Sequence, residues 1–374
     1  MPKIFAYYLP QFHSFKENDE WWGKGFTEWT NVGKAKPLFK GHDQPRIPTE
    51  LGYYNLKMPE VREAQAKMAK EAGIDGFLYW HYWFGNGKTL MADIINEVIE
   101  AGKPDFPFAI AWANHSWFAK TWRKDTVEGK QLLVEQTYPG EEDIKLFFNS
   151  LLVAFKDHRY IKIDGKPLIL IFDPVNLPDE YITGLKKLAE QHGFPGLYII
   201  ANIVNPQTNQ SEFISRGFDA VTYQRLSGAT PKMVGKSKWL NRGYKAFRWM
   251  KGLILKRPPK MTDYAVAYHD LVTSKEFEEN VIPSIVPQWD HTPRSGWNGS
   301  LFVNSEPRFF KQHALEAFKT LENKPKEQQI VILKSWNEWG EGNYMEPDMT
   351  HGRGFIDALR EAKNEFTIHN IEED

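Results

Sequence analysis

Two glutamates near the end of the sequence, Glu338 and Glu341, have the residue type and spacing best suited to catalysis. They follow the apolar run 330–333 and stand beside two indole side chains, Trp336 and Trp339. In glycosidic-bond chemistry one carboxyl group protonates the leaving oxygen, and the other acts as base, nucleophile or cation stabiliser. A Glu-x-x-Glu pair in an ordinary loop is only surface charge, but this aromatic frame at a strand end favours chemistry on a sugar.

Short apolar runs alternate with longer helical patterns along the chain, which predicts parallel strands joined by crossover helices. The eight expected strands lie near residues 4–9, 76–80, 108–112, 168–172, 197–201, 220–223, 285–288 and 330–334. The expected helices lie near 61–72, 90–101, 141–156, 179–192, 211–216, 264–278, 306–321 and 354–365. Eight such units predict an α/β fold, a single (β/α)8 TIM barrel that spans residues 1–374 as one catalytic domain. An open doubly wound sheet is the alternative, but no Gly-x-Gly-x-x-Gly follows any predicted strand.

A TIM barrel gathers its functional groups beyond the C-terminal ends of its strands, so polar and aromatic residues there are candidate substrate contacts. Amides and aromatic rings are frequent at these positions, and such groups hydrogen-bond to carbohydrate or stack on it. The predicted substrate-binding residues are Tyr8, Gln11, His13, Trp29, Trp80, His81, Tyr82, Trp112, Asn114, His115, Asp173, Tyr223, Trp289, Asp290, Arg294, Trp336 and Asn337.

Two long segments interrupt the alternation, one after the first strand and one after the sixth. Segment 14–59 is rich in Trp and Phe, so we expect it to fold over the barrel mouth and build part of the site. Segment 225–260 carries eleven Lys or Arg and no Asp or Glu. Its interleaved basic and aromatic residues are typical of a helix that lies on an anionic membrane surface. A site for an anionic or diphosphate-linked glycan and a solvated insertion are the alternatives.

Several other classes of function are disfavoured by the sequence. A net charge of −1 gives no general electrostatic case for binding nucleic acid. The absence of cysteine excludes disulfides and thiolate catalysis. Four histidines, His13, His81, His115 and His291, fall at expected strand ends, but no His-x-His or His-Glu-x-x-His motif joins them, so no metal is expected.

No serine-hydrolase elbow and no phosphate-binding loop occur, so the sequence predicts no serine nucleophile and no cofactor. The first residues lack the pattern of a signal peptide, and no apolar run reaches transmembrane length. The prediction is a cytoplasmic protein, with peripheral contact to the inner face of the membrane through 225–260 as a further hypothesis.

Long motifs that run in order along nearly the whole chain resemble the WbsX-like family. They read Tyr-Tyr-Leu-Pro-Gln-Phe-His at 7–13, Trp-Trp-Gly-Lys-Gly-Phe-Thr-Glu-Trp-Thr-Asn-Val at 21–32, Gly-His-Asp-Gln-Pro-Arg at 41–46, Tyr-Trp-His-Tyr-Trp-Phe at 79–84 and Gln-Trp-Asp-His-Thr-Pro-Arg at 288–294, and the stretch 336–348 completes the match. That family occurs in surface-polysaccharide loci and is labelled glycosyltransferase. It is similar in turn to the endo-α-mannosidases of glycoside hydrolase family ninety-nine, which are (β/α)8 barrels. Where the family usually reads Trp-Ala-Asn-Glu-x-Trp, this chain has Trp-Ala-Asn-His-Ser-Trp at 112–117, which puts any substrate contact of that glutamate in doubt.

The resemblance to the mannosidases implies a role for each glutamate. Glu341 would be the general acid and later the base, with a raised pKa suited to that role. Glu338 would assist the sugar 2-hydroxyl in attacking its own anomeric carbon. A conventional retaining enzyme would instead use Glu338 as the direct nucleophile, and the sequence leaves the two roles open.

Three functions follow as hypotheses. The first is a glycoside hydrolase-like enzyme that cleaves or transfers at an α-linked, mannose-like glycosidic bond of a surface polysaccharide or glycolipid. The second is a glycosyltransferase of O-antigen or capsule biosynthesis. The third is a non-catalytic glycan-binding protein, because an enzyme fold does not by itself establish activity.

Overall fold

The computed structural model describes residues 1–118, 131–227 and 260–373, with scattered positions between 243 and 258. Most of the predicted basic segment 225–260 therefore lies outside the described residues, and its membrane role stays a prediction. No helix in the described ranges has both the length and the apolar character needed to cross a membrane.

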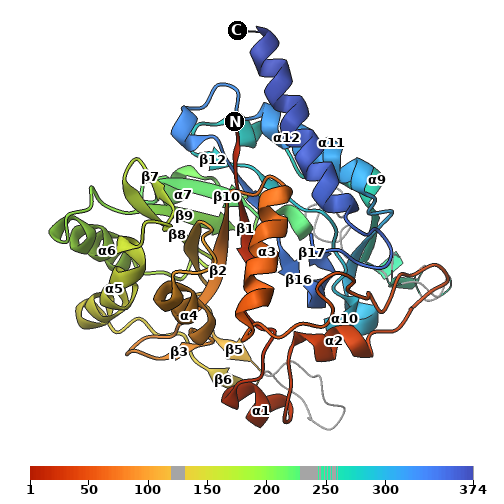
Figure 1. Ribbon diagram of the computed structural model, residues 1–374, viewed down its shortest axis with the longest axis horizontal. Coiled ribbons are helices and arrows are strands. Elements are labelled where there is room, and N and C mark those ends of the chain that lie inside the picture. The colour runs from red at the N-terminus through yellow and green to blue at the C-terminus, as the bar shows by residue number, and fades with distance from the viewer. Residues whose placement is uncertain are drawn as a thin grey trace.

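A sheet of parallel strands forms the centre of the molecule (Figure 1). The strands that form the barrel are β1 (Lys3–Tyr8), β2 (Gly76–Trp83), β4 (Phe108–Trp112), β8 (Lys166–Ile171), β9 (Tyr198–Ile203), β10 (Ala220–Tyr223), β12 (Val281–Ile282), β13 (Ser284–Ile285) and β15 (Ile330–Leu333). Their order is β12-β10-β9-β8-β4-β2-β1-β15-β13. This arrangement confirms the predicted (β/α)8 TIM barrel.

The barrel closes at its seventh strand, which is divided in two. The strands at the two ends of the order, β12 and β13, are separated in the chain only by Pro283. The carbonyl oxygen of Pro283 still accepts a hydrogen bond from the Ile332 amide at 3.0 Å. Proline has no N–H to give to a ladder, so it interrupts the strand without opening the barrel. The strand predicted at 285–288 thus lies further upstream, at 281–285.

The barrel strands are buried on both faces, as expected for parallel strands covered by helices. The covering helices are α3 (Pro59–Glu71), α4 (Asp93–Ala101), α5 (Glu141–Lys156), α6 (Asp179–Gln191), α7 (Ser211–Ile214), α11 (Pro307–Lys319) and α12 (Gly354–Glu373). They match seven of the predicted helices, although α7 is shorter and α12 continues beyond the expected end at residue 365.

The helix predicted over 264–278 is wrong. Only α9 (Tyr264–Ala267) is α-helical there, and two 3-10 turns follow it. The break has a local cause, because the Thr273 side chain and the Glu276 side chain form a capping box that starts a new turn. The Glu276 carboxylate also pairs with Arg225 at 2.6 Å, which fixes this turn against the end of β10.

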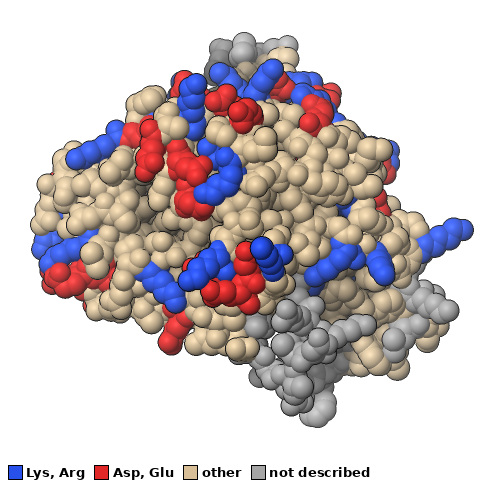
Figure 2. Space-filling model, turned by 60° about the horizontal axis from the view of Figure 1, so that its bottom comes forward, with Lys and Arg blue, Asp and Glu red and all other residues tan. Residues whose placement is uncertain are grey.

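The C-terminal ends of the strands point toward the bottom of Figure 1, where short elements gather. These are α1 (Lys16–Trp22), α2 (Glu28–Lys34), α10 (Thr292–Ser295), the hairpin of β5 (Trp117–Phe118) with β6 (Leu132–Val134), and the hairpin of β16 (Asn337–Glu338) with β17 (Asn343–Tyr344). On the described surface seen from this end, basic and acidic side chains are interspersed (Figure 2), in keeping with the near-zero net charge.

Segment 14–59 contains α1 and α2 and is joined to the chain that follows the eighth strand. The Thr49 amide donates to the Pro347 carbonyl at 3.0 Å, and the Met349 amide donates to the Ile47 carbonyl at 2.9 Å. The Tyr54 hydroxyl reaches the buried Glu346 carboxylate at 3.0 Å. These bonds hold two distant stretches of sequence together at the end of the barrel.

Candidate active site

A cavity of about 800 Å³ lies at the C-terminal ends of the barrel strands. Its floor comes from the ends of β1, β2 and β4 and from the turns after β8 and β15, and one wall comes from α1 and α2 of segment 14–59. Polar and apolar side chains alternate around it. The volume lies within the range typical of sites that enclose a small organic ligand.

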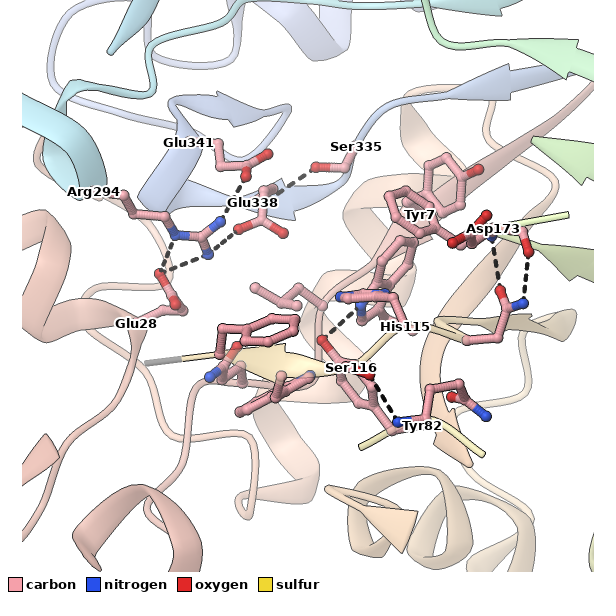
Figure 3. A pocket seen from close by; sticks show the side chains of 18 of the residues that line it. Tyr7, Glu28, Tyr82, His115, Ser116, Asp173, Arg294, Ser335, Glu338 and Glu341 are labelled. Atoms are coloured by element: carbon pink, nitrogen blue, oxygen red, sulfur yellow. Dashed lines mark hydrogen bonds and ion pairs between the residues drawn. The ribbon is translucent and has the colours of Figure 1, made fainter. Parts of the chain in front are cut away.

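One guanidinium group, that of Arg294, binds both candidate catalytic glutamates (Figure 3). Nη2 donates to Glu338 Oε1 at 2.5 Å, and Nη1 donates to Glu341 Oε1 at 2.8 Å. Glu338 ends β16, and Glu341 follows one 3-10 turn later, so the hairpin directs both side chains at α10, which carries Arg294. Only 15% of the Glu338 side chain and 16% of the Glu341 side chain are exposed.

Burial raises the pKa of Glu338 to about 8. Arg294 and Lys334 act against that rise, whereas the negative charges of Glu341 and Glu28 add to it. The family resemblance implied a raised pKa at Glu341, and the raised pKa of Glu338 makes Glu338 a second candidate for the acid of the pair.

Further ionisable groups surround Glu341. Its Oε1 lies 3.6 Å from His291 Nε2, and its Oε2 lies 3.8 Å from Lys334 Nζ. The Lys334 ammonium also lies 5.2 Å from the centre of the Trp289 ring, which favours a cation above the ring face.

The turn between the two glutamates requires glycine at two positions. A Cβ on Gly340 would overlap the Glu28 carboxylate and approach Arg294 Nε to 2.9 Å. Gly342 has φ +53°, and its Cβ would come within 2.7 Å of Asp290 Cβ. A side chain is strained at such a φ and has no room in so close a contact, so the chain can turn here only with glycine.

Aromatic rings line the middle of the cavity. Trp80 makes edge contacts with Tyr7 at 5.6 Å and with Phe172 at 4.8 Å between ring centroids, and its indole N–H donates to the Tyr82 hydroxyl at 2.9 Å. Tyr82 in turn makes an edge contact with Trp117 at 5.0 Å. Fixed rings of this kind offer flat apolar faces on which a sugar ring can stack.

Asp173 lies on the opposite side of Figure 3 from Arg294, and the side-chain amides of Asn114 and Asn176 are hydrogen-bonded to it. The Asn114 amide nitrogen donates to the Asp173 carbonyl at 2.7 Å, and its amide oxygen accepts from the Asp173 amide at 2.7 Å. The Asp173 carboxylate accepts from Asn176 Nδ2 at 2.8 Å. Asn114 thus holds the turn that presents Asp173 and Asn176 to the cavity.

The structure brings ten of the predicted residues to this cavity: Tyr8, Gln11, Trp80, Tyr82, Asn114, His115, Asp173, Arg294, Glu338 and Glu341. It does not bring the other nine there, namely His13, Trp29, His81, Trp112, Tyr223, Trp289, Asp290, Trp336 and Asn337.

The alternation of side chains along a strand explains why two of these nine residues, His81 and Trp112, lie outside the cavity. Because β2 continues to Trp83, its side chains alternate past residue 80, so that Trp80 and Tyr82 face the cavity and His81 faces outward. His81 packs against Phe147 of α5 with 6.3 Å between ring centroids, and burial lowers its pKa to about 4. Trp112 packs against the same Phe147 at 4.4 Å.

Structural hydrogen bonds explain two more. The buried Asn337 side chain accepts from the Leu9 amide at 2.7 Å and donates to the Leu9 carbonyl at 3.0 Å, which joins β16 to the end of β1. The buried Asp290 carboxylate accepts from Gln44 Nε2 at 2.7 Å and lies 2.8 Å from His42 Nε2. Both side chains stabilise the loops around the site.

The remaining five are packed within the fold. His13 lies 3.3 Å from Asp93, and Trp289 donates to Ser300 at 3.0 Å. The others are Trp29, which packs on Tyr54 and Trp339, Trp336, which packs on Phe77, and Tyr223, whose hydroxyl donates to the Thr208 carbonyl.

Several cavity residues were not among the predicted contacts: Tyr7, Leu9, Trp22, Phe26, Glu28, Asn31, Ser116, Trp117, Phe118, Gln136, Tyr138, Phe172, Asn176, Lys334 and Ser335. The motifs at 7–13, 21–32 and 112–117 contain many of them, so the motifs could have indicated these positions. Gln136, Tyr138 and Asn176 lie outside every motif, and nothing in the sequence pointed to them.

Within the described ranges, no group of three or more His, Cys, Asp or Glu side chains could hold a metal ion.

Residues 4–359 match a family model described as Glycosyltransferase WbsX. Two curated relatives from strains of Xanthomonas campestris pv. campestris, both called Uncharacterized protein WxcX, are 30% identical over 365 residues. The match covers 96% of this chain and 49% of each relative, so the chain spans about half the length of the curated relatives it matches.

Three solved structures have similar folds. A GH99 endo-alpha-mannosidase from Bacteroides thetaiotaomicron in complex with bis-tris-propane has a TM-score of 0.59 at 14% identity, covering 99% of this chain and 98% of its own. A second structure of a GH99 endo-alpha-mannosidase from that organism has a TM-score of 0.56 at 12% identity, covering 97% of each chain. A glycoside hydrolase-like protein has a TM-score of 0.58 at 16% identity, covering 96% and 93%. At these identities the likeness shows a shared fold.

Proposed function

Since this chain belongs to the Glycosyltransferase WbsX family, we propose that it is a carbohydrate-active enzyme that cleaves or transfers at a glycosidic bond of a surface polysaccharide. One observation carries the proposal: Glu338 and Glu341 both bind the guanidinium of Arg294 in the wall of a cavity lined with aromatic rings. The α-linked, mannose-like character of the substrate is part of the proposal and is supported only by the likeness of fold.

Two carboxyl groups joined through one guanidinium support a retaining mechanism. Retaining glycosidases keep their carboxyl groups about 5–5.5 Å apart, whereas inverting enzymes separate them by about 6.5–9.5 Å to admit a water molecule. Both Glu338 and Glu341 lie within 2.8 Å of nitrogens of the same Arg294 side chain, which favours the shorter class. Arg294 also stabilises negative charge on whichever carboxyl group is ionised.

The acid and the nucleophile remain to be assigned within the pair. The family likeness gives the acid role to Glu341, with Glu338 as nucleophile or as base toward the 2-hydroxyl. The raised pKa of Glu338 favours Glu338 as the group that holds the proton before substrate enters. Because the two carboxyl groups lie against one cation, their protons are shared between them as a pair.

The proposal predicts that Glu338→Gln and Glu341→Gln each lower turnover of an α-mannosyl oligosaccharide by about a hundredfold or more while leaving glycan binding nearly intact. Steady-state turnover and calorimetric binding measure the two effects. Glu327→Gln is a matched control, because Glu327 pairs with Lys3 on the surface at the far end of the barrel. Full turnover in both cavity variants would refute the assignment.

A substrate with a fluoride leaving group separates the two roles. Fluoride departs without protonation, so the variant that lacks the acid should recover most of its turnover on this substrate. The variant that lacks the nucleophile, or the base to the 2-hydroxyl, should stay inactive on both substrates. Recovery in Glu341→Gln supports the assignment from the family likeness, and recovery in Glu338→Gln supports the assignment from the pKa.

A glycosyltransferase of O-antigen or capsule biosynthesis is the second candidate, and the description of the family favours it. A sugar-nucleotide donor bound only by the native state must raise the free energy of unfolding, by about 2.7 kcal/mol at a concentration of a hundred times the Kd, and with it the melting temperature. Stabilisation by mannosyl oligosaccharides but not by a panel of sugar nucleotides would favour the first candidate. Glycan binding without turnover on either class would identify a non-catalytic glycan-binding protein.

Contact with a glycolipid or with the inner face of a membrane through 225–260 is a separate part of the proposal. Co-sedimentation with vesicles rich in anionic lipid, compared between the native protein and a variant with neutralised Lys and Arg in 225–260, tests it. Equal binding of the two proteins would argue against a membrane role.

A further inference from the structure

A third carboxylate, that of Glu28, contacts the same guanidinium from outside the barrel. Glu28 begins α2 in segment 14–59, and only 5% of its side chain is exposed. Its Oε2 lies 2.9 Å from Arg294 Nη2 and 3.3 Å from Arg294 Nε. Figure 3 shows Arg294 held between Glu28 on one side and the pair Glu338 and Glu341 on the other.

These contacts fix how the guanidinium is turned. Nε and Nη2 face Glu28, while Nη2 and Nη1 face the two candidate catalytic glutamates. A guanidinium is planar with donors in a rigid fork, so an acceptor on the Nε edge determines where the other donors point. Without Glu28, Arg294 could rotate toward either glutamate alone.

The backbone of the catalytic turn supplies an independent observation. Gly340 lies between Glu338 and Glu341 in sequence, and a Cβ there would overlap the Glu28 carboxylate. Glu28 therefore packs directly on the turn that presents the two glutamates. The Asn31 amide donates to the same oxygen of Glu28 at 3.4 Å, and the Glu28 amide donates to the Gln11 carbonyl at 3.2 Å.

We propose that Glu28 is a positioning residue, which holds the Arg294 guanidinium in place against both Glu338 and Glu341. The proposal rests on the proposed function only for its effect on turnover. With all three carboxyl groups ionised, Arg294 would face three negative charges, so one of the three groups retains a proton to a higher pH.

Other ionisable groups also lie close to Glu338 and Glu341. They are Lys334 after β15, His291 at the start of α10 and Tyr82 in β2. Burial lowers the pKa of Lys34 at the end of α2, and the nearby charge of Glu28 opposes this effect. None of these groups is altered by the substitution used below.

The test is Glu28→Gln, examined first without any substrate. Glutamate labelled with carbon-13 at the side-chain carboxyl reports the titration of each carboxyl group by NMR, and the Glu338→Gln spectrum assigns the signal of Glu338. Loss of the Glu28 charge should move the titration of Glu338 down by about one pH unit, a tenfold change in its ionisation constant. A folded Glu28→Gln protein with an unchanged Glu338 titration would overturn the proposal.

Glu50→Gln is the matched control from the same segment, because Glu50 pairs with Arg353 at the surface, and it should leave the titration unchanged.

Catalytic turnover by the Glu28→Gln variant provides a second test of the proposal. If the proposed function holds, Glu28→Gln should lower kcat at least tenfold with little change in KM and should move the alkaline limb of the pH profile to lower pH. Glu28→Asp, which keeps the charge, should restore part of the profile. A shifted titration in a protein that turns over no glycan would support the role of Glu28 and count against the proposed function, so the two failures are distinguishable.

Discussion

The raised pKa of Glu338 makes the stability of the fold depend on pH. Its pKa is raised to about 8 by burial, whereas a glutamate in the unfolded chain titrates near ~4.3. The folded state therefore binds the proton more tightly than the unfolded state does. Its contribution to the free energy of unfolding is full below about pH 4.3 and is lost as the pH rises through about 8.

Glu338→Gln removes this pH-dependent loss of stability, because glutamine is neutral at every pH. We expect the variant to melt several degrees higher than the native protein at pH 9 and to differ little from it at pH 5. Thermal unfolding at the two pH values measures the effect. A melting difference that is the same at both pH values would contradict the assigned pKa.

At the residue scale, the sequence predicted ten of the residues that line the cavity and missed fifteen others. The glutamate pair, Arg294 and the ring of Trp80 could be found because motif and strand end coincide there. Asp290 resembled a substrate contact for the same reason, but its carboxylate is occupied by His42 and Gln44. Glu28 was missed because its partner Arg294 lies 266 residues away, and no local pattern encodes that contact.

Among the elements, the turn between β16 and β17 requires glycine at position 342. Gly342 has φ +53°, and its position against Asp290 leaves no space for a side chain. Gly342→Ala should lower the free energy of unfolding by about 2–4 kcal/mol, since strain and close contact add. It should also reduce turnover, because Glu341 immediately precedes it.

Gly87→Ala is the matched control for this prediction. Gly87 also has a positive φ, +76°, but a Cβ there meets nothing within 4 Å. Its substitution should cost only the conformational strain, about 1 kcal/mol. Urea unfolding of the two variants measures the difference, and equal losses would mean that the contact with Asp290 contributes nothing.

Element prediction succeeded where a periodic pattern was continuous and failed where side chains interrupted it. The helix predicted over 141–156 matches α5 (Glu141–Lys156), since its apolar face repeats without a break. The helix predicted over 264–278 is broken by the Thr273 capping box. The strand predicted at 285–288 was misplaced because Pro283 divides the actual strand, and a proline inside a strand argues against that strand in sequence.

For the whole molecule, the buried Asp290 joins segment 14–59 to the end of the seventh strand. Burial acts to raise the Asp290 pKa, but hydrogen bonds from His42, Thr292 and Gln44 together with the charge of Arg46 leave it below its usual value. The stability that Asp290 contributes is present above the unfolded pKa of about 3.9 and is lost as the pH falls through the lower folded value.

Asp290→Ala should lower the free energy of unfolding near pH 7 by about 3–5 kcal/mol, because it leaves buried donors without an acceptor. Hydrogen exchange of residues 42–46 should become faster than exchange in β1. Asp43→Ala is the control, since its side chain is 42% exposed and should change stability by less than about 0.5 kcal/mol. Unchanged exchange in 42–46 would show that other bonds hold the segment.

The contacts between segment 14–59 and the last quarter of the chain also affect how chimeras between family members can be built. The Glu28–Arg294 ion pair, the Tyr54–Glu346 hydrogen bond and the Thr49–Pro347 hydrogen bond each have one partner in this segment and the other in the last quarter of the chain. A chimera that takes only one of the two regions from a relative would therefore have side chains from two different proteins facing each other in these contacts. Exchanging both regions as one unit should transfer substrate preference while the recipient barrel is retained.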